Sequence, residues 1–234
     1  MKFAKEIYKE YPTLLMQRAN YFRKVYNEFE ERKQFEFYLD LGCGKGYNTR
    51  AFKDIAKRFI GLEPIKQDLK EAKRNNPEGQ FYNGNATYIS FENETFDVIS
   101  SFSVLEHISE LDKALDEINR VLVKGGVIIL QQPNKFFFVE LHTYLPLLYV
   151  IPIKLRRKIL LRLGYSEDAI LATQLSVGTL LKKLNMRGIH TQCVKMIYPE
   201  QIIPKKFRSV YLFFRSIGLF KVIPFGYFIV GHKK

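Results

Sequence analysis

Short runs of apolar residues alternate with amphipathic stretches between residues 35 and 132. The first such run covers residues 37–41, and strands are also predicted over 58–63, 80–86, 96–103 and 127–131. Apolar runs of this length, bounded by turn residues, are typical of strands buried on both faces of a parallel sheet. A helix is predicted after the first run, over residues 49–58. Strands that alternate with helices predict an α/β fold with a doubly wound, mostly parallel sheet.

Helical spacing of apolar residues continues outside this region. Residues 1–34 show it, in one or two amphipathic helices, and so do residues 180–188, where a glycine closes the helix. Two more strands are predicted over residues 190–198 and 225–231. Between them we expect a helix at 210–217, flanked by Lys and Arg.

The turn after the first strand has glycine at alternate positions, Gly42, Gly44 and Gly46. Glycine permits positive φ angles and close approach of a ligand, and the helix that follows offers free N–H groups. A dinucleotide-binding turn needs Gly-x-Gly-x-x-Gly, but Tyr47 stands where the third glycine should be. Asp40, just before the turn, would repel a pyrophosphate and could accept a hydrogen bond from an ammonium group. We therefore predict a ligand with a cationic amino-acid end.

Further candidate ligand groups stand at the ends of the other predicted strands. Glu63 ends the second strand, where a carboxylate in this type of fold hydrogen-bonds ribose hydroxyls. Asn85 follows the third strand, and its amide oxygen could face an adenine edge. Ligands bind such sheets at the carboxyl ends of the strands. We therefore expect one site that is formed by Glu63, Asn85, Asp40, Gly42 and Phe102.

Five motifs, in order along the chain, resemble those of the class I S-adenosylmethionine-dependent methyltransferases, and most closely the large group of small-molecule enzymes (methyltransferase type 11). They are Asp40-Leu-Gly-Cys-Gly-Lys-Gly46, Gly61-Leu-Glu-Pro64, Phe96-Asp-Val-Ile-Ser100, Val104-Leu-Glu-His-Ile108 and Val121-Leu-Val-Lys-Gly-Gly126. The resemblance covers residues 35–132 and, more weakly, the last two strands. Two departures are visible: Asn85 stands where the family usually has Asp, and Val123-Lys124 replaces a Lys-Pro pair.

The resemblance implies a Rossmann-like sheet of seven strands with an antiparallel last strand. The sequence between the predicted strands adds helical insertions after strand 5 and between strands 6 and 7. It also implies S-adenosyl-L-methionine as the cofactor and S-adenosyl-L-homocysteine as the product. The predicted cofactor-binding residues are Asp40, Gly42, Cys43, Gly44, Gly46, Glu63, Pro64, Asn85, Ala86, Ser101 and Phe102.

The 234 residues are expected to form one methyltransferase domain. Its parts would be an N-terminal helical cap (1–34), the cofactor-binding core (35–134), a helical substrate or lid insertion (135–178), and a C-terminal part (179–234) with strands 6 and 7 and an inserted basic helix. The insertion is inferred because roughly 45 residues are too many for a simple connection.

Candidate catalytic residues stand in this insertion. It opens with an apolar, proline-marked segment that contains Glu140 and His142. Burying these side chains unpaired would be costly, so we expect them to pair with each other or to face a cavity. His142 is the predicted general base, with Glu140 holding its tautomer. His107 is the alternative, since in the resembled family its segment lies near the sulfonium end of the cofactor.

The formal net charge is +13, and from Lys154 onward the chain has only three acidic residues, Glu167, Asp168 and Glu200. A basic segment interleaved with Phe, Tyr and Leu can contact anionic lipid, nucleic acid or an acidic substrate, or can be ordinary solvated surface. A basic amphipathic helix at 154–162 fits a helix that lies on an anionic membrane.

Cysteine usage and hydropathy bear on the compartment. Cys43 and Cys193 are too few for a disulfide framework, and they and four scattered His show no metal-ligand spacing, so no metal site is expected. Charged residues interrupt the N-terminal segment, and polar residues and prolines interrupt the longest apolar stretch, 136–153. We expect a cytoplasmic protein, with peripheral contact at the membrane as an option. The oligomeric state is left open.

The leading functional hypothesis is methyl transfer from S-adenosylmethionine to a small or amphipathic acceptor, such as a lipid- or glycan-linked molecule. An RNA methyltransferase is the competing enzyme, but no Asn-Pro-Pro-Tyr-type motif follows strand 4, where Ser101-Phe-Ser-Val104 stands. A non-catalytic S-adenosylmethionine-binding or scaffold protein is the alternative outside enzymes. The intact Asp40, glycine turn and Glu63 argue against it.

Overall fold

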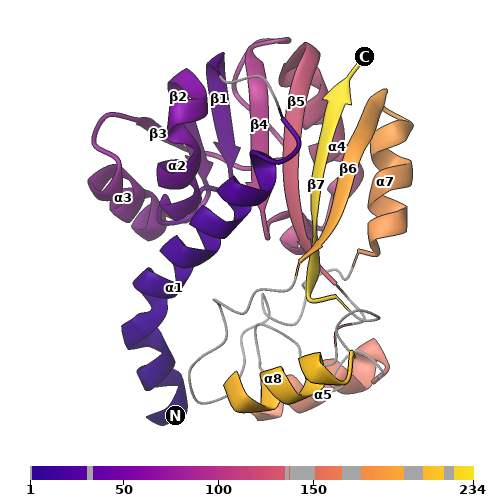
Figure 1. Ribbon diagram of the computed structural model, residues 1–234. Helices are drawn as coiled ribbons and strands as arrows, with labels where there is room; N and C mark the ends of the chain where they lie inside the picture. The colour runs from indigo at the N-terminus through magenta and orange to yellow at the C-terminus, as the bar shows by residue number, and fades with distance from the viewer. Residues whose placement is uncertain are drawn as a thin grey trace.

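The computed structural model describes residues 2–30, 34–134, 137, 151–164, 175–197, 208–218 and 224–234. One sheet dominates it (Figure 1). Its strands are β1 (Phe35–Leu41), β2 (Ala56–Glu63), β3 (Gln80–Asn83), β4 (Phe96–Phe102), β5 (Leu122–Pro133), β6 (Ile189–Ile197) and β7 (Gly226–Lys233). The spatial order is β3-β2-β1-β4-β5-β7-β6, and β7 alone runs antiparallel to both of its neighbours. The predicted seven-stranded, doubly wound fold is confirmed.

Helices cover both faces of the sheet (Figure 1). The described helices are α1 (Lys2–Tyr26), α2 (Tyr47–Phe52), α3 (Lys66–Asn75), α4 (Leu111–Val121), α5 (Ile153–Arg162), α7 (Val177–Asn185) and α8 (Arg208–Ser216), with short 3-10 turns η1 (Lys53–Ile55) and η2 (Leu105–His107). On one face, α4 and α7 pack on the sheet through residues such as Leu115 and Leu184. On the other, α1 and α2 do so through Phe22 and Phe52.

Several predicted boundaries need correction. The helix predicted over 49–58 is too long: α2 ends at Phe52, and residues 56–58 already belong to β2. Ala56 is buried in the core between α1 and the sheet, so packing overrides the helical pattern of this short segment. The third strand ends at Asn83, not at residue 86, because Gly84 is followed by a turn. The fifth strand begins at Leu122, not at residue 127, and contains an irregularity, since Leu122 pairs with Phe96 and Val127 already pairs with Val98.

The N-terminal segment forms a single helix, α1, which crosses the sheet diagonally (Figure 1). The buried side chains described in α1 are near its C-terminal end, where the Phe22 ring stacks on Phe102 with centroids 5.5 Å apart. Phe102 is the last residue of β4, so α1 packs directly against one of the strand ends that line the predicted site.

Helices α5 and α8 lie beyond the carboxyl ends of the parallel strands (Figure 1). They belong to the two insertions predicted after strand 5 and between strands 6 and 7. The predicted site and the described helices of both insertions are therefore at the same end of the molecule.

Candidate functional site

Asp40 lies at the carboxyl end of β1 and is held by two hydroxyl groups. Its carboxylate accepts a hydrogen bond from Thr49 Oγ1 (2.5 Å) and another from Ser100 Oγ (2.9 Å). Ser100 Oγ also contacts Tyr38 Oη at 2.6 Å. Asp40 is only 1% exposed, and this burial raises the pKa of its carboxyl group to about 6, although both hydroxyls favour the charged form. A cation next to Asp40 would lower that pKa.

The glycine turn is shaped by two different constraints. A Cβ atom at Gly46 (φ +79°) would lie 2.5 Å from Asn76 Nδ2 and 3.1 Å from the Cα of Ala72 in α3, so glycine is needed there for packing. A Cβ atom at Gly44 (φ +52°) would meet nothing within 4 Å. Gly44 therefore borders open space, and this space is where a ligand can approach the backbone of the turn.

Glu63 ends β2, the strand next to β1, and turns its carboxylate toward the same glycine turn. Glu63 Oε2 accepts a hydrogen bond from Gly44 N at 2.9 Å, and Oε1 accepts one from Ile65 N at 2.9 Å. Burial raises the pKa of the Glu63 carboxyl group, and the two backbone N–H groups oppose this shift. Each carboxylate oxygen keeps a further lone pair, so Glu63 can still accept from ligand hydroxyls.

Asparagine side chains at the end of α3 hold the backbone of the glycine turn, a role that was not predicted from the sequence. Asn76 Nδ2 donates to the carbonyl oxygen of Gly46 (3.0 Å), and Asn75 Nδ2 donates to that of Lys45 (2.8 Å). Asn83 Nδ2 likewise donates to the carbonyl oxygens of Glu63 and Pro64. Polar residues in such positions give no periodic signal, so only the folded chain shows which carbonyl each one reaches.

Contacts in the structure refine what the motifs suggested for Asn85, Ala86 and Cys43. Asn85 Oδ1 accepts three hydrogen bonds, from the N–H and hydroxyl of Thr87 and the N–H of Tyr88. Its Nδ2 group is therefore better placed for a ligand than the oxygen. Ala86 is buried in the hydrophobic core. The side chain of Cys43 packs with Leu69 and Phe81, so this residue offers a ligand no thiol.

The end of β4 closes the site on its other side. Ser103 follows Phe102 and has a positive φ of 56°, a strained conformation for a residue other than glycine. Its hydroxyl contacts Gln131 Oε1 at 2.5 Å, and its N–H donates to the Gln131 carbonyl. This bend brings Val104 against the turn, where a Cβ atom at Gly42 would lie 2.4 Å from Val104 Cγ2. Ser101 Oγ is buried and has no hydrogen bond to any described residue.

Of the three predicted catalytic residues, the structure describes only His107. Glu140 and His142 lie outside the described residues. His107 ends the 3-10 turn η2 with an exposed side chain, and its Nε2 is 4.0 Å from Oε1 of the buried Glu106. No group of three or more metal-ligating side chains occurs in the part of the chain that the structure describes.

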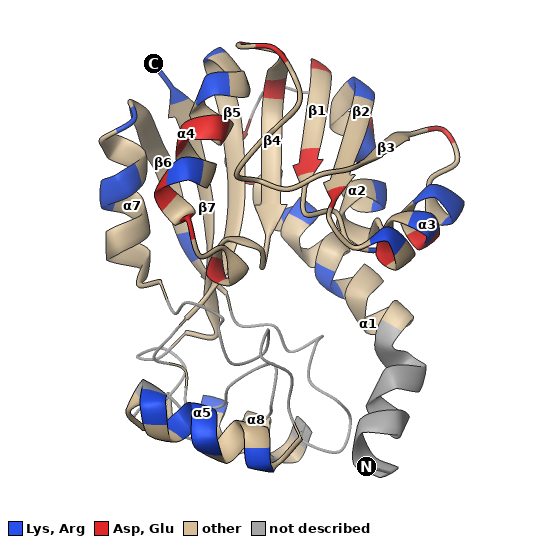
Figure 2. Cartoon of the chain, turned by 180° about the vertical axis from the view of Figure 1, so that it is seen from behind, with Lys and Arg blue, Asp and Glu red and all other residues tan. Residues whose placement is uncertain are grey.

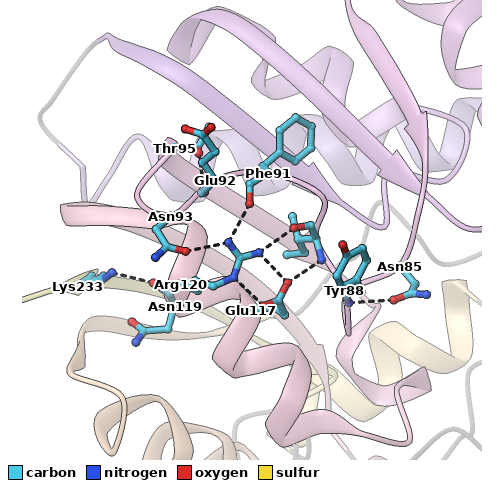
Figure 3. A network of polar contacts seen from close by, with 11 residues as sticks. Asn85, Tyr88, Phe91, Glu92, Asn93, Thr95, Glu117, Asn119, Arg120 and Lys233 are labelled. Carbon is cyan, nitrogen blue, oxygen red and sulfur yellow. Dashed lines mark hydrogen bonds and ion pairs between the residues drawn. The ribbon is translucent and has the colours of Figure 1, made fainter.

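A surface cavity of about 660 Å³ lies away from the glycine turn. It is lined by residues 88–92 and by Thr95, Glu117 and Arg120. Figure 3 shows why it is structural: Arg120 donates hydrogen bonds to the carbonyl oxygens of Ile89 and Phe91 and to the carboxylate of Glu117. Glu117 in turn accepts from Ile89 N at 2.7 Å. The charges of Arg120 and Glu117 are thus committed to holding the 85–95 loop on α4.

The strand order brings Asn85, Glu63, Asp40 and Phe102 to one edge of the sheet, from four adjacent strands. Two buried carboxylates beside an open glycine turn fit a ligand with a ribose and an ammonium group, and the turn lacks the geometry for a pyrophosphate. This combination of fold and site defines the class of Rossmann-like nucleoside-binding proteins with a methyltransferase-type sheet.

Comparison with known proteins finds similarity to methyltransferases over part of the chain. Residues 39–130 match the family model described as a methyltransferase domain. A probable S-adenosylmethionine-dependent methyltransferase of Mycolicibacterium smegmatis is 30% identical over 114 residues, which are 49% of this chain and 44% of that protein. An uncharacterized protein of Methanocaldococcus jannaschii is 34% identical over 142 residues, 58% of this chain and 52% of that protein. The chain thus spans about half the length of these relatives.

Solved structures agree on the fold. An S-adenosylmethionine-dependent methyltransferase from Mesorhizobium loti superposes with a TM-score of 0.64 at 16% sequence identity, and the match covers 96% of this chain and 97% of that one. Over residues 39–130 the chain is thus similar to methyltransferase domains, and its fold agrees with that of the solved methyltransferase. The resemblance seen in its motifs is confirmed over this part of the chain, and the matched relative is named as a probable S-adenosylmethionine-dependent methyltransferase.

Proposed function

We propose that this chain transfers the methyl group of S-adenosylmethionine to a small or amphipathic acceptor. The observation that carries the proposal is the pair of buried carboxylates, Asp40 and Glu63, on either side of a glycine turn whose middle glycine borders open space. When bound, the cofactor supplies a methyl group on a sulfonium, which is already activated for transfer. The protein then has to hold the acceptor in line and exclude water.

Each described residue has a distinct task in this proposal. Glu63 accepts hydrogen bonds from ribose hydroxyls, while the N–H groups of Gly44 and Ile65 keep its carboxylate oriented. Asp40 faces the ammonium group, and Thr49 and Ser100 hold it in place. The Nδ2 group of Asn85 can contact the adenine. Phe102 supports the floor of the site through its stacking on Phe22.

The acceptor side of the proposal rests on the two insertions. Their described helices, α5 and α8, lie beyond the carboxyl ends of the parallel strands and carry Lys and Arg (Figure 2). The other residues of these helices are mostly apolar, and this combination suits a lipid- or glycan-linked acceptor. His142 as general base, with Glu140 as its partner, stays a prediction, as does His107. A hydroxyl acceptor would require such a base, and replacing a working base should lower turnover by about 100-fold or more.

RNA methylation remains the second candidate because the chain carries a net charge of +13. A gel shift with tRNA separates the candidates, since binding through phosphates weakens steeply as salt rises. A non-catalytic binding protein would bind S-adenosylmethionine yet methylate no fraction of a cell extract.

The proposal is tested by calorimetric titration with S-adenosylmethionine and S-adenosylhomocysteine. Wild type should bind at about micromolar concentration, and Asp40→Ala and Glu63→Ala should each weaken binding at least tenfold, about 1.4 kcal/mol or more. Asp97→Ala is the matched control. Asp97 also accepts two backbone N–H groups, those of Glu36 and Phe37, but at the amino end of β1.

The Asp97 variant should bind the cofactor as wild type does. Equal losses in Asp97→Ala and Glu63→Ala would mean that the variants act through the sheet and not through a cofactor contact. A wild-type protein that binds neither ligand would contradict the proposed function.

A further inference from the structure

We propose that the outer surfaces of α5 and α8 dock the protein on an anionic phospholipid bilayer. We call this surface the α5–α8 face and define it by three cations, Lys154, Lys158 and Arg162, and three apolar residues, Leu161, Phe213 and Ile217. The inference deepens the proposed function, on which it rests, by naming where an amphipathic acceptor would come from.

The cations of α5 form a stripe. Arg156 and Leu160 are buried, so the opposite side of the helix is turned to solvent. Lys154, Lys158 and Arg162 recur every four residues on that exposed side. Neither α5 nor α8 contains an acidic residue. The stripe therefore has no neutralising charge on its own helices.

Cations near the end of α7 are arranged differently. Lys183 and Arg187, at the end of α7, form ion pairs with Asp112 and Asp116 of α4. The three cations of the stripe form no ion pair within the described part of the chain. Figure 2 shows the contrast, because α5 and α8 carry blue bands without red, whereas blue and red lie together on α3 and α4.

Large apolar side chains accompany these cations. Phe213 is 60% exposed, Ile217 61% and Leu161 44%. Single exposed apolar residues are ordinary, but here they gather on α5, on α8 and on the turn that follows α8, at one end of the molecule. Helices with Lys or Arg beside Phe and Leu lie in the plane of a membrane interface, with the apolar groups inserted among the acyl chains.

The position of the face fits the proposed chemistry. Both helices lie at the carboxyl end of the strands, which is also the end that carries Asp40, Glu63 and the glycine turn (Figure 1). An acceptor in the bilayer would reach the methyl group from the docked side. Among the described residues no helix is both long and apolar enough to cross a bilayer, so contact through this face would be superficial.

A bilayer fits this face better than RNA does. Both would attract the cations, because RNA is a polyanion and the bilayer has an anionic surface. RNA binding uses aromatic side chains on which bases stack, but the exposed apolar groups here include the aliphatic Leu161 and Ile217. Aliphatic groups gain more from an acyl environment.

The test is co-sedimentation of the full chain with vesicles of phosphatidylcholine, alone or mixed with phosphatidylglycerol. We expect binding to the mixed vesicles only, weakening as salt rises. Lys154→Gln/Lys158→Gln/Arg162→Gln should weaken this binding about 100-fold. Phe213→Ser/Ile217→Ser should also weaken it, because it removes the inserting groups while it leaves every charge in place. Arg156 and Leu160 stay unchanged, so that α5 keeps its packing.

The matched control is Lys70→Gln/Lys73→Gln/Arg74→Gln, which removes three exposed cations from another helix, α3. It should bind the mixed vesicles as wild type does. Equal losses in the α3 and α5 variants, equal binding to both kinds of vesicle, or binding to tRNA without binding to vesicles would overturn the proposal.

Titration of each protein with S-adenosylmethionine separates the two proposals. Cofactor binding without vesicle binding would reject the docking face and leave the proposed function in place. Vesicle binding without cofactor binding would do the reverse. Retained cofactor affinity in the α5 and α8 variants also shows that they are folded.

Discussion

At the scale of single residues, the glycine turn separates positions that serve folding from positions that serve a ligand. Gly44 and Gly46 are two residues apart and both have positive φ angles. Only Gly46 is enclosed by neighbouring atoms, those of Asn76 and Ala72. The two glycines should therefore respond differently to the same substitution.

Gly44→Ala should fold, with a loss of about 1–2 kcal/mol from the positive φ angle, but should bind S-adenosylmethionine at least tenfold more weakly. Gly46→Ala should lose more stability, because its Cβ atom would also press on α3. Urea unfolding and calorimetry of both variants provide the measurement. Unchanged cofactor affinity in Gly44→Ala would show that the open space beside it is not part of the cofactor site.

Asp40 should lower the stability of the free protein in a pH-dependent way. Its pKa is about 6 in the folded protein against an ordinary 3.8, so the native state holds the proton more tightly than the unfolded chain does. Below about pH 4 the carboxyl group is protonated in both states and costs nothing. As the pH rises through 6, the folded state loses up to about 3 kcal/mol relative to the unfolded state.

Asp40→Asn should therefore gain stability relative to wild type between pH 4 and pH 7, by about 3 kcal/mol at most, while it loses cofactor affinity. Urea unfolding of both proteins across this range gives the difference, in which the other titrating groups cancel. A difference that does not change with pH would contradict the raised pKa.

At the scale of elements, the 85–95 loop depends on one side chain of α4 for its attachment. Arg120 reaches the carbonyl oxygens of Ile89 and Phe91 and the side chain of Asn93, and it is oriented by Glu117 (Figure 3). The loop begins next to Asn85, so the attachment of the loop affects the part of the site where we propose that the adenine binds.

Arg120→Met should lower the free energy of unfolding by about 1–3 kcal/mol, because it leaves carbonyl groups of the loop without their donors. Hydrogen exchange should rise for residues 89–93 in particular. Arg187→Met is the control, because Arg187 pairs with Asp112 and Asp116 on another side of α4. If both variants raised exchange in the loop equally, the Arg120 contacts would not be what holds it.

Sequence patterns predicted some helices and strands correctly and misplaced the ends of others. The buried parts of β1 and β5 were found because apolar runs next to glycine have few alternative interpretations. The end of α2 was misplaced because residues 56–58 carry a pattern compatible with helix or strand, and their pairing with β1 decides the matter. Asp40, Glu63 and the glycines stand in a compact motif, whereas Thr49, Ser100 and Asn76 act through contacts between distant segments.

At the scale of the whole molecule, both faces of the sheet are packed by helices from several parts of the chain. The core on the α1 side includes Phe22 from α1, Phe52 from α2 and Phe228 from β7. Such shared packing favours unfolding in one cooperative step, as expected for a single domain.

Far-ultraviolet circular dichroism and tyrosine fluorescence should therefore report coincident urea transitions. S-adenosylmethionine at about 100 times its dissociation constant should stabilise the protein by about 2.7 kcal/mol, and Glu63→Ala should abolish this effect. Two separate transitions would contradict the single-domain interpretation. A ligand effect that persists in Glu63→Ala would place the cofactor elsewhere.

Strand β7 is the last strand in chain order, yet it lies between β5 and β6. During synthesis on the ribosome, β5 and β6 lack the strand with which both of them pair, because β7 emerges after both of them. During that interval β5 exposes an apolar edge, residues 127–130, to other molecules in the cell. The protein should therefore depend on protection during synthesis more than its finished form suggests.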